Sequence, residues 1–572
     1  MLEANPRGLL LPRIYLTPPD WWAKANPDEC QVLSHGGKHY RQGIGHGRDG
    51  KAFPSLASLQ WRADTADALR HAWSDPRAEF EKVKVPSQAA REAGRNQRTF
   101  RDPATEMAVI DWYLFYNDLV PDTMEVFLGA AKEASDFRKV VGAFYCYMFE
   151  FGGDPEYGHN ALDRLLRSKH LDFAIVTASY HNRALGRGAD YARAPITSVG
   201  LHGKLWYHDN DTVSFRYDEI HRASQDRATV ERYRKELGVT GTAQETIWQY
   251  RRGAGFVLRN GIYQSFFDLH GGYFDAPELM AEVTRLNALL DEAKQDDCSS
   301  VAEILVVSEE VSCGYATFES GFLQQTLQPA QVQLAKLGAP HDSILVDDLA
   351  RAEMKRYKLV IFLNCFHLTD RQRELIRRTV LWCYAPGLFN GPKASVEAMH
   401  ELTHIRLVPG KAGERLRLRM SLNAAGSALL AGVAAASKII GHEHVWGQWF
   451  SVEDPQAIAL GHVEGHGEVA LAMKRLKDWN SIYTLNPVLP VSLLRALARQ
   501  AGIHIYNDRD DTLYASRSYL CLNADGAGER TLRWPSPARL FDPFTGRTLT
   551  QQTTEFTHRF ADRETLLIRH GR

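Results

Sequence analysis

Cysteine is scarce and scattered in this chain of 572 residues. The seven cysteines are an odd number, and no two of them form a Cys-x-x-Cys pair. They stand at positions 30, 146, 298, 313, 365, 383 and 521. A disulfide framework needs paired cysteines, and a cysteine zinc site needs clustered ones. The sequence therefore argues against both.

Long runs of one charge sign and long apolar runs are also lacking. The formal net charge is −1, so neither nucleic acid nor an anionic membrane is expected as a partner. The stretch closest to a membrane span, residues 424–440, contains Gly, Ser and Lys. The first eight residues carry no signal-peptide pattern. We therefore expect a cytoplasmic protein.

Motifs for phosphate, metal or cysteine chemistry are incomplete. The Gly- and His-rich segment 35–51 lacks the spacing of a phosphate-binding loop. The histidines at 442, 444, 462 and 466 are close in sequence, but flanking glycines disfavour the helix that a zinc motif needs. Cys365 lacks the G-x-C-x-G turn of a cysteine nucleophile. No cofactor and no metal ion are expected, and catalysis by Cys365 is disfavoured.

What the chain does contain is an alternation of strand and helix patterns. Over residues 1–297 this alternation predicts a parallel sheet or a (β/α)8-type barrel. Five strands are recognisable, and they are expected to end near Thr17, Glu150, Thr177, Asp209 and Asp268. Because eight strands close such a barrel, we expect an incomplete one, with its open edge covered by a loop, another chain or the second domain.

Two further domains are expected, within an α/β fold class overall. Residues 298–505 alternate again and predict a doubly wound sheet of flavodoxin or amidotransferase type. Residues 506–572 contain short alternating strands with turns at Asp525-Gly and Thr545-Gly. This pattern predicts a small antiparallel β domain.

The densest polar cluster closes the stretch from Leu201 to Asp211, which we interpret as a strand after a turn at residues 194–199. Asp209 and Asp211 end it, with Trp206 just before them. In parallel barrels, catalytic groups collect at the carboxyl ends of strands. Aromatic rings beside carboxylates suit a sugar, which has an apolar ring face and a rim of hydroxyls. The alternative is a surface turn with capping aspartates.

Motifs of moderate specificity follow one another over nearly the whole chain. They are residues 12–22 with Asn26-Pro-Asp-Glu29, Ala72-Trp73, Phe144-Tyr-Cys-Tyr147, His202-Gly-Lys-Leu-Trp206, Asp268 with Gly271-Gly272, Trp382-Cys-Tyr-Ala-Pro-Gly387, and Asp511 with Tyr514. Together with the domain order, they resemble glycoside hydrolase family 42, the β-galactosidase type. The resemblance implies a catalytic barrel, a trimerisation domain, a small β domain and a carbohydrate substrate.

The sequence departs from that family in three places. The first two barrel strands would precede Met1, and the segment that should hold the fourth strand with its acid/base Glu is missing near Trp61. The nucleophile position holds Asp209 instead of Glu. A retaining glycosidase needs a nucleophile and an acid/base about 5 Å apart. We therefore assign Asp209 as nucleophile and Glu150 as acid, with a salt-bridge or sugar-hydroxyl partner as the alternative role of Glu150.

Nine further residues are candidate substrate ligands: Trp21, Trp22, Tyr180, Arg183, His202, Lys204, Trp206, Asp211 and Asp268. For the group around His202 and Lys204, packing at a strand end is the alternative.

Two functions stay open. The first is a glycosidase that cleaves O-glycosidic bonds with retention, β-galactosidase-like. The second is a degenerate member that binds carbohydrate or serves only in assembly. In either case a homo-oligomer, trimer or dimer, is expected.

Overall fold

The computed structural model describes residues 32–35, 38–41, 85–94, 97–224, 226–268, 271–317, 321–376, 379–411, 414–423, 429–430, 433 and 439–571. The chain divides into two compact units, residues 1–91 and 92–572. In the first unit, β1 (Val32–His35) pairs antiparallel with β2 (Lys38–Arg41). A short helix, α3 (Gln88–Glu92), ends at the division. The strand expected near Thr17 and the motifs at residues 12–29 and 72–73 lie outside the described residues.

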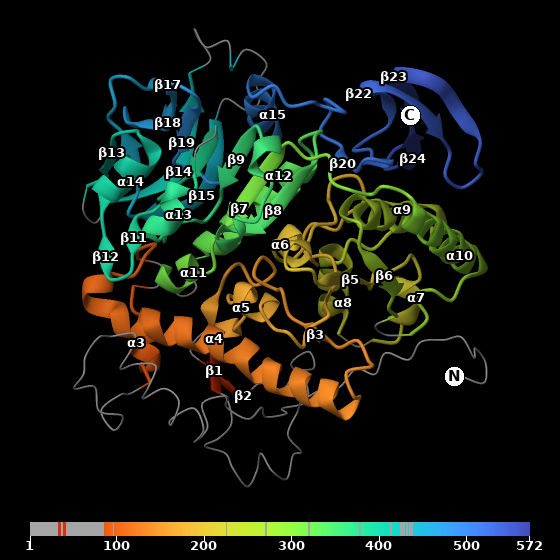
Figure 1. Ribbon diagram of the computed structural model, residues 1–572, viewed down its shortest axis with the longest axis horizontal. Coiled ribbons are helices and arrows are strands. Elements are labelled where there is room, and N and C mark those ends of the chain that lie inside the picture. Colours follow the sequence, from red (N-terminus) through yellow and green to blue (C-terminus); the bar gives the residue numbers. More distant parts are fainter. Residues whose placement is uncertain are drawn as a thin grey trace. The chain divides into compact units, whose positions relative to one another are not determined.

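The first sheet of the second unit is parallel, and its four strands follow chain order (Figure 1). They are β3 (Gly142–Phe144), β4 (Phe173–Val176), β5 (Leu205–Asn210) and β6 (Tyr263–Phe266). Its helices are α4 (Pro103–Ala134), α5 (Leu162–Leu166), α6 (Ile196–Leu201), α7 (Tyr217–Ile220), α8 (Arg227–Glu236), α9 (Ala243–Asn260) and α10 (Pro277–Glu292), with 3-10 turns η3 (Pro155–Tyr157) and η4 (Ala293–Gln295). Within the described residues these strands do not close into a barrel. That the whole region 1–297 is an incomplete barrel stays a prediction.

Two sequence expectations for this region were wrong in detail. The strand expected to end at Glu150 ends at Phe144, because Cys146 adopts a φ of 73° that breaks an extended chain. The turn at 194–199 is helix α6, whose Thr197 and Ser198 hydroxyls accept backbone N–H groups of the second sheet.

The second sheet has eleven strands, several of which are labelled in Figure 1. Five of them, β7 (Ile304–Ser308), β8 (His341–Leu345), β9 (Leu359–Phe362), β10 (Val380–Cys383) and β19 (Asn480–Thr484), pair in parallel. Their spatial order is β8-β7-β9-β10-β19. This is the 2-1-3-4-5 order of flavodoxin-like sheets.

The remaining strands of the second sheet extend it with antiparallel pairs that the sequence patterns did not indicate. They are β13 (Leu407–Pro409), β14 (Arg415–Leu422), β15 (Ile439–Gly447), β16 (Phe450–Val452), β17 (Ile458–Val463) and β18 (Val469–Arg475). A separate two-stranded ribbon is formed by β11 (Phe389–Asn390) and β12 (Lys393–Ala394). The helices are α11 (Val311–Tyr315), α12 (Phe322–Ala335), α13 (Asp370–Glu374), α14 (Val396–Thr403) and α15 (Val491–Gln500), with turns η5 (Val346–Asp348) and η6 (Met354–Arg356).

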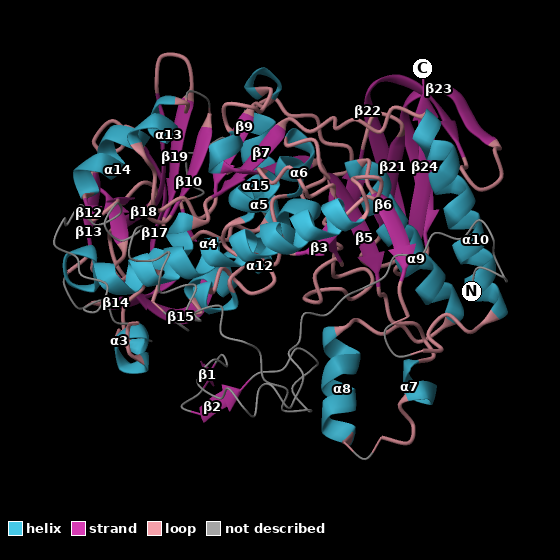
Figure 2. Ribbon diagram, turned by 60° about the horizontal axis from the view of Figure 1, so that its bottom comes forward, coloured by secondary structure: helices cyan, strands magenta, loops and turns pink. Residues whose placement is uncertain are grey.

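The third sheet is antiparallel and contains the long paired strands at the carboxyl end of the chain (Figure 2). Its order is β20-β21-β24-β22-β23. The strands are β20 (Thr512–Ala515), β21 (Tyr519–Asn523), β22 (Gly528–Phe541), β23 (Thr548–Phe560) and β24 (Thr565–Gly571). The antiparallel pattern predicted after residue 506 matches these strands, whereas the three domain boundaries stay predictions.

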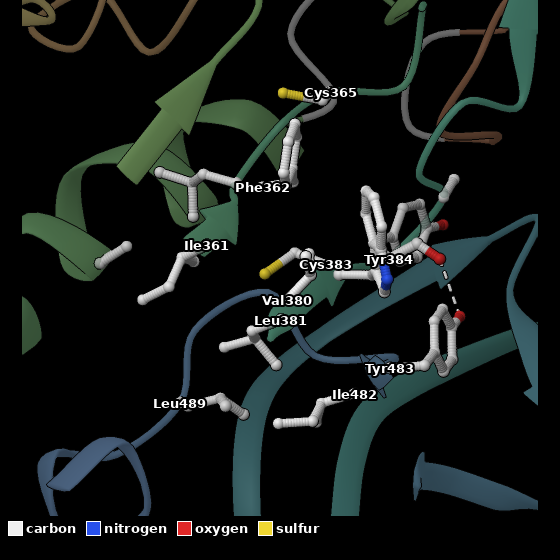
Figure 3. Close-up of a cluster of buried hydrophobic side chains, with 14 of the residues drawn as sticks. Ile361, Phe362, Cys365, Val380, Leu381, Cys383, Tyr384, Ile482, Tyr483 and Leu489 are labelled. Carbon is white, nitrogen blue, oxygen red and sulfur yellow. Dashed lines mark hydrogen bonds between the residues drawn. The ribbon is translucent and has the colours of Figure 1, made fainter. Parts of the chain in front are cut away.

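Buried apolar side chains hold the second sheet together. Ile361, Trp382 and Ile482 come from adjacent strands and are at most 3% exposed. Figure 3 shows neighbouring side chains of this cluster, where the Tyr483 hydroxyl donates to the Tyr384 carbonyl oxygen at 2.7 Å. A continuous apolar run on a parallel strand is typical of burial on both faces, which explains why β9 is Leu-Val-Ile-Phe and β10 is Val-Leu-Trp-Cys.

A second apolar cluster connects the first sheet with the third. On α9, the Phe256 ring contacts that of Tyr514 with centroids 5.9 Å apart. Gly255 lets the helix approach β21 so closely that a Cβ atom there would lie 2.4 Å from the sulfur of Cys521. The Tyr514 hydroxyl donates to the Asp190 carbonyl oxygen at 2.7 Å. The two sheets therefore share one core.

Candidate active site

Polar side chains gather where β3, β4 and β5 end. Glu150 follows β3, Tyr180 and Arg183 follow β4, and Asp211 is the first residue after β5. Because the strands are parallel, their carboxyl ends meet at one edge of the sheet. The four residues that the sequence placed at strand ends are joined there by hydrogen bonds and an ion pair.

Glu150 is buried and faces a guanidinium. Its Oε1 accepts the backbone N–H of Tyr180 at 3.2 Å, and its Oε2 lies 3.6 Å from Nε of Arg193. Arg193 in turn donates to the Ala178 carbonyl oxygen at 2.9 Å. Burial lowers the pKa of Arg193, but Glu150 and the neighbouring tyrosines outweigh this effect and raise it. Arg193 is therefore a fixed positive charge at this edge.

Asp211 is held by one hydrogen bond and one ion pair. The Tyr180 hydroxyl donates to its Oδ2 at 2.6 Å, and Nη1 of Arg183 lies 2.9 Å from its Oδ1 as an ion pair. Two guanidinium groups contact the Tyr180 ring, with the Arg193 and Arg183 guanidinium carbons 4.2 Å and 4.6 Å from its centroid. Burial, followed by the charge of Asp211, raises the pKa of Tyr180 to about 12. The Tyr180 hydroxyl therefore stays a donor at neutral pH.

Asp209 lies on the face of β5 opposite Trp206, because side chains alternate along a strand. Its Oδ1 accepts the Ser265 hydroxyl of β6 at 3.0 Å, in register with the backbone pairing of the two residues. Trp206 is 3% exposed and belongs to the apolar core with Phe256. On the same face as Trp206, burial lowers the pKa of His208 to about 4.

Of the remaining sequence candidates, Asp268 follows a strand at this same edge, whereas His202 and Lys204 lie away from it. His202 and Lys204 precede β5 and lie at the opposite end of the sheet, where Lys204 donates to the carbonyl oxygens of Ser168 and Leu171 at 2.7 Å. Asp268 follows β6 and accepts the backbone N–H groups of Gly271 and Tyr273. Trp21 and Trp22 lie outside the described residues.

Two residues of the cluster were missed by the sequence reasoning. Arg193 lies in a loop before α6, and no spacing ties it to a strand end. His181 adjoins Tyr180, and its Nε2 lies 3.8 Å from Oε1 of Glu150. The His181 side chain is 43% exposed, whereas those of Glu150 and Asp211 are 7% and 2% exposed. His181 is therefore the accessible member beside buried carboxylates.

Comparisons with known proteins bear on the fold. A scan against protein-family models and a search of curated proteins found no match. Among solved structures, a family 42 β-galactosidase from G. stearothermophilus matches with a TM-score of 0.55 and 13% identity, over 97% of this chain and 87% of that one. The fold is similar to that of family 42 β-galactosidases.

Two more solved β-galactosidases agree with this family 42-like fold. The enzyme from the Antarctic haloarchaeon Halorubrum lacusprofundi has a TM-score of 0.53 and 11% identity, over 97% of this chain and 88% of that one. The enzyme from Bacillus circulans sp. alkalophilus has a TM-score of 0.52 and 13% identity, over 90% and 76%. The resemblance inferred from the motifs is thus confirmed as a likeness of fold.

No helix in the described part of the chain is long and apolar enough to cross a membrane.

Proposed function

We propose that this protein is a glycoside hydrolase that cleaves O-glycosidic bonds with retention, as a β-galactosidase-like exo-enzyme. The observation that carries the proposal is the convergence of Glu150, Tyr180, Arg183 and Asp211 at the carboxyl edge of the first sheet. This edge holds the catalytic groups of parallel barrels. The family 42-like fold supports the same substrate class.

In this proposal Asp209 is the nucleophile and Glu150 the acid/base. The Asp209 carboxylate attacks the anomeric carbon while Glu150 gives its proton to the leaving oxygen, so that a glycosyl ester forms. Glu150 then takes a proton from water, which attacks the same carbon and releases Asp209. Tyr180, Arg183 and Asp211 position the sugar. His202, Lys204 and Trp206 are left out, because they lie at the other end of the sheet or in the core.

A second function has its own supporting observation. Glu150 and Asp211 are buried, and each faces an arginine at 3.6 Å and 2.9 Å respectively. Ion pairs of this kind are common where a polar network only fixes a fold. These contacts favour a member that binds carbohydrate, or serves in assembly, without turnover.

A panel of nitrophenyl glycosides separates the two functions. A hydrolase releases nitrophenol from at least one sugar, and Asp209→Asn abolishes this release while the fold is retained, because the amide cannot form the ester. Asp291→Asn is the matched control, since this aspartate is 72% exposed on α10. If no sugar is cleaved but one binds in calorimetry, the second function holds.

Asp209→Glu refines the assignment of the nucleophile. The longer side chain restores the residue type of the resembled family and moves the carboxylate by one methylene. Since a misplacement of about 1 Å can cost roughly a hundredfold in rate, kcat should change strongly in one direction or the other. Unchanged kcat in both Asp209 variants would remove this residue from the mechanism.

We also infer that the protein is cytoplasmic and assembles as a trimer or dimer through the domain of residues 298–505. The support for assembly through this domain is the parallel core of the second sheet, which has the strand order of flavodoxin-like folds. The resembled family uses its second domain for assembly.

A further inference from the structure

Three potential metal ligands meet between the first and second sheets, away from the candidate active site. Asp163 lies in the first turn of α5, His202 ends α6, and Asp348 lies in η5 after β8. Nε2 of His202 is 2.9 Å from Oδ1 of Asp348 and 3.9 Å from Oδ1 of Asp163. One ligand atom from each of the three residues lies within 4.8 Å of the others.

These side chains are shielded from water to different degrees. The side chain of Asp348 is 1% exposed, that of His202 is 4% and that of Asp163 is 18%. Oδ2 of Asp348 is buried and has no hydrogen-bond donor in the described part of the chain. An ionised oxygen in that position carries a desolvation cost, which a bound cation would offset.

The neighbouring cations leave room for a further positive charge. Arg167 pairs with Oδ2 of Asp163 at 2.6 Å, and Arg351 lies 3.3 Å from Oδ1 of Asp348. Both arginine side chains are at least half exposed, at 61% and 50%. They approach from the solvent side, whereas Oδ1 of Asp163 and Oδ2 of Asp348 are not engaged by either guanidinium in these pairs.

We propose that Asp163, His202 and Asp348 bind a divalent first-row transition metal ion such as Zn²⁺ or Mn²⁺. An imidazole nitrogen and two carboxylate oxygens are a ligand set that such ions accept. With metal–ligand bonds of about 2.0–2.2 Å, two ligand atoms of one ion lie roughly 3–4 Å apart. The 3.9 Å from His202 to Asp163 falls in that range. The 2.9 Å from His202 to Asp348 is a hydrogen bond, which the ion would replace.

The bound ion cross-links two sheets. α5 and α6 belong to the first sheet, and η5 belongs to the second, to which α6 is already joined by the bond from the Leu345 N–H to the Ser198 hydroxyl. Because the ion binds the folded chain and its ligands are dispersed in the unfolded chain, it stabilises the fold. This role is independent of the proposed hydrolysis.

The test uses the full chain, stripped with a chelator and then titrated with Co²⁺, whose absorption reports bound nitrogen and oxygen ligands. We expect one tightly bound Co²⁺ per chain and a rise in melting temperature with added Zn²⁺ or Mn²⁺. Asp163→Asn and His202→Gln should each weaken binding by at least about tenfold, since even indirect ligand partners have effects of that size.

His400→Gln is the matched control, because His400 forms an exposed pair with Glu397 at 3.2 Å on α14. It should bind Co²⁺ like the unaltered chain. Asp163→Asn keeps the test sound if His202→Gln does not fold, because Asp163 is the most exposed of the three ligands. Absence of stoichiometric binding in the unaltered chain would overturn the proposal. So would equal binding in all folded variants, which would place the ion elsewhere, for example on the other histidine-rich stretches.

Discussion

The buried pair of Glu150 and Arg193 allows a quantitative test of how the candidate site is held together. Arg193→Met removes a fully buried guanidinium, its contact with the Tyr180 ring and the partner of Glu150. Removing one member of a buried ion pair costs about 3–5 kcal/mol. The two groups are 3.6 Å apart without a hydrogen bond, so we expect the lower end, about 3 kcal/mol.

Glu150→Gln should cost less, because the amide oxygen can still accept the Tyr180 N–H. The double variant should be more stable than the sum of the two losses predicts, by about 1–2 kcal/mol, since neither charge is then left unpaired. Urea unfolding, monitored by circular dichroism, measures the free energy of unfolding of each variant, provided that the m-value does not change. If the stability loss of the double variant equals the sum of the two single losses within about 0.5 kcal/mol, the pairing of Glu150 with Arg193 is refuted. Arg232→Met, in an exposed pair at 4.0 Å, is the control and should change stability by less than about 1 kcal/mol.

Three further predictions concern the pH dependence, the packing and the assembly. Burial lowers the pKa of His208 to about 4, so stability should be lost as pH falls from about 6.5 towards 4, by at most about 1.4 kcal/mol per pH unit. His208→Gln should flatten the melting profile in that window, and an unaltered slope would contradict the assignment. Gly255→Ala should destabilise the fold by about 1–3 kcal/mol, because the added Cβ meets Cys521. Gly200→Ala is the control and should not, because the space around Gly200 is open. Equal melting temperatures of the two variants would contradict the close packing at Gly255. Light scattering should give a multiple of 64.5 kDa, and a single species of that mass would count against assembly.

The sequence by itself determined the alternation of elements and part of the site. The apolar runs before Thr177 and Asp209 predicted strands that are present as β4 and β5. Parallel strands bring their carboxyl ends to one edge. Residues far apart in the chain, such as Glu150, Tyr180 and Asp211, could therefore be grouped without coordinates.

Only the tertiary structure decided which side chains face that edge. His202 and Trp206 lie in the same run as Asp209, but a strand has two ends and two faces. Periodicity does not say which end and which face carry the site. Residues 196–201 became helical against β8 although they contain β-branched residues, because burial and hydrogen bonds from β8 outweigh local preference. Arg193 reaches Glu150 from a loop, and a contact of that kind depends on how the chain packs, which local sequence does not encode.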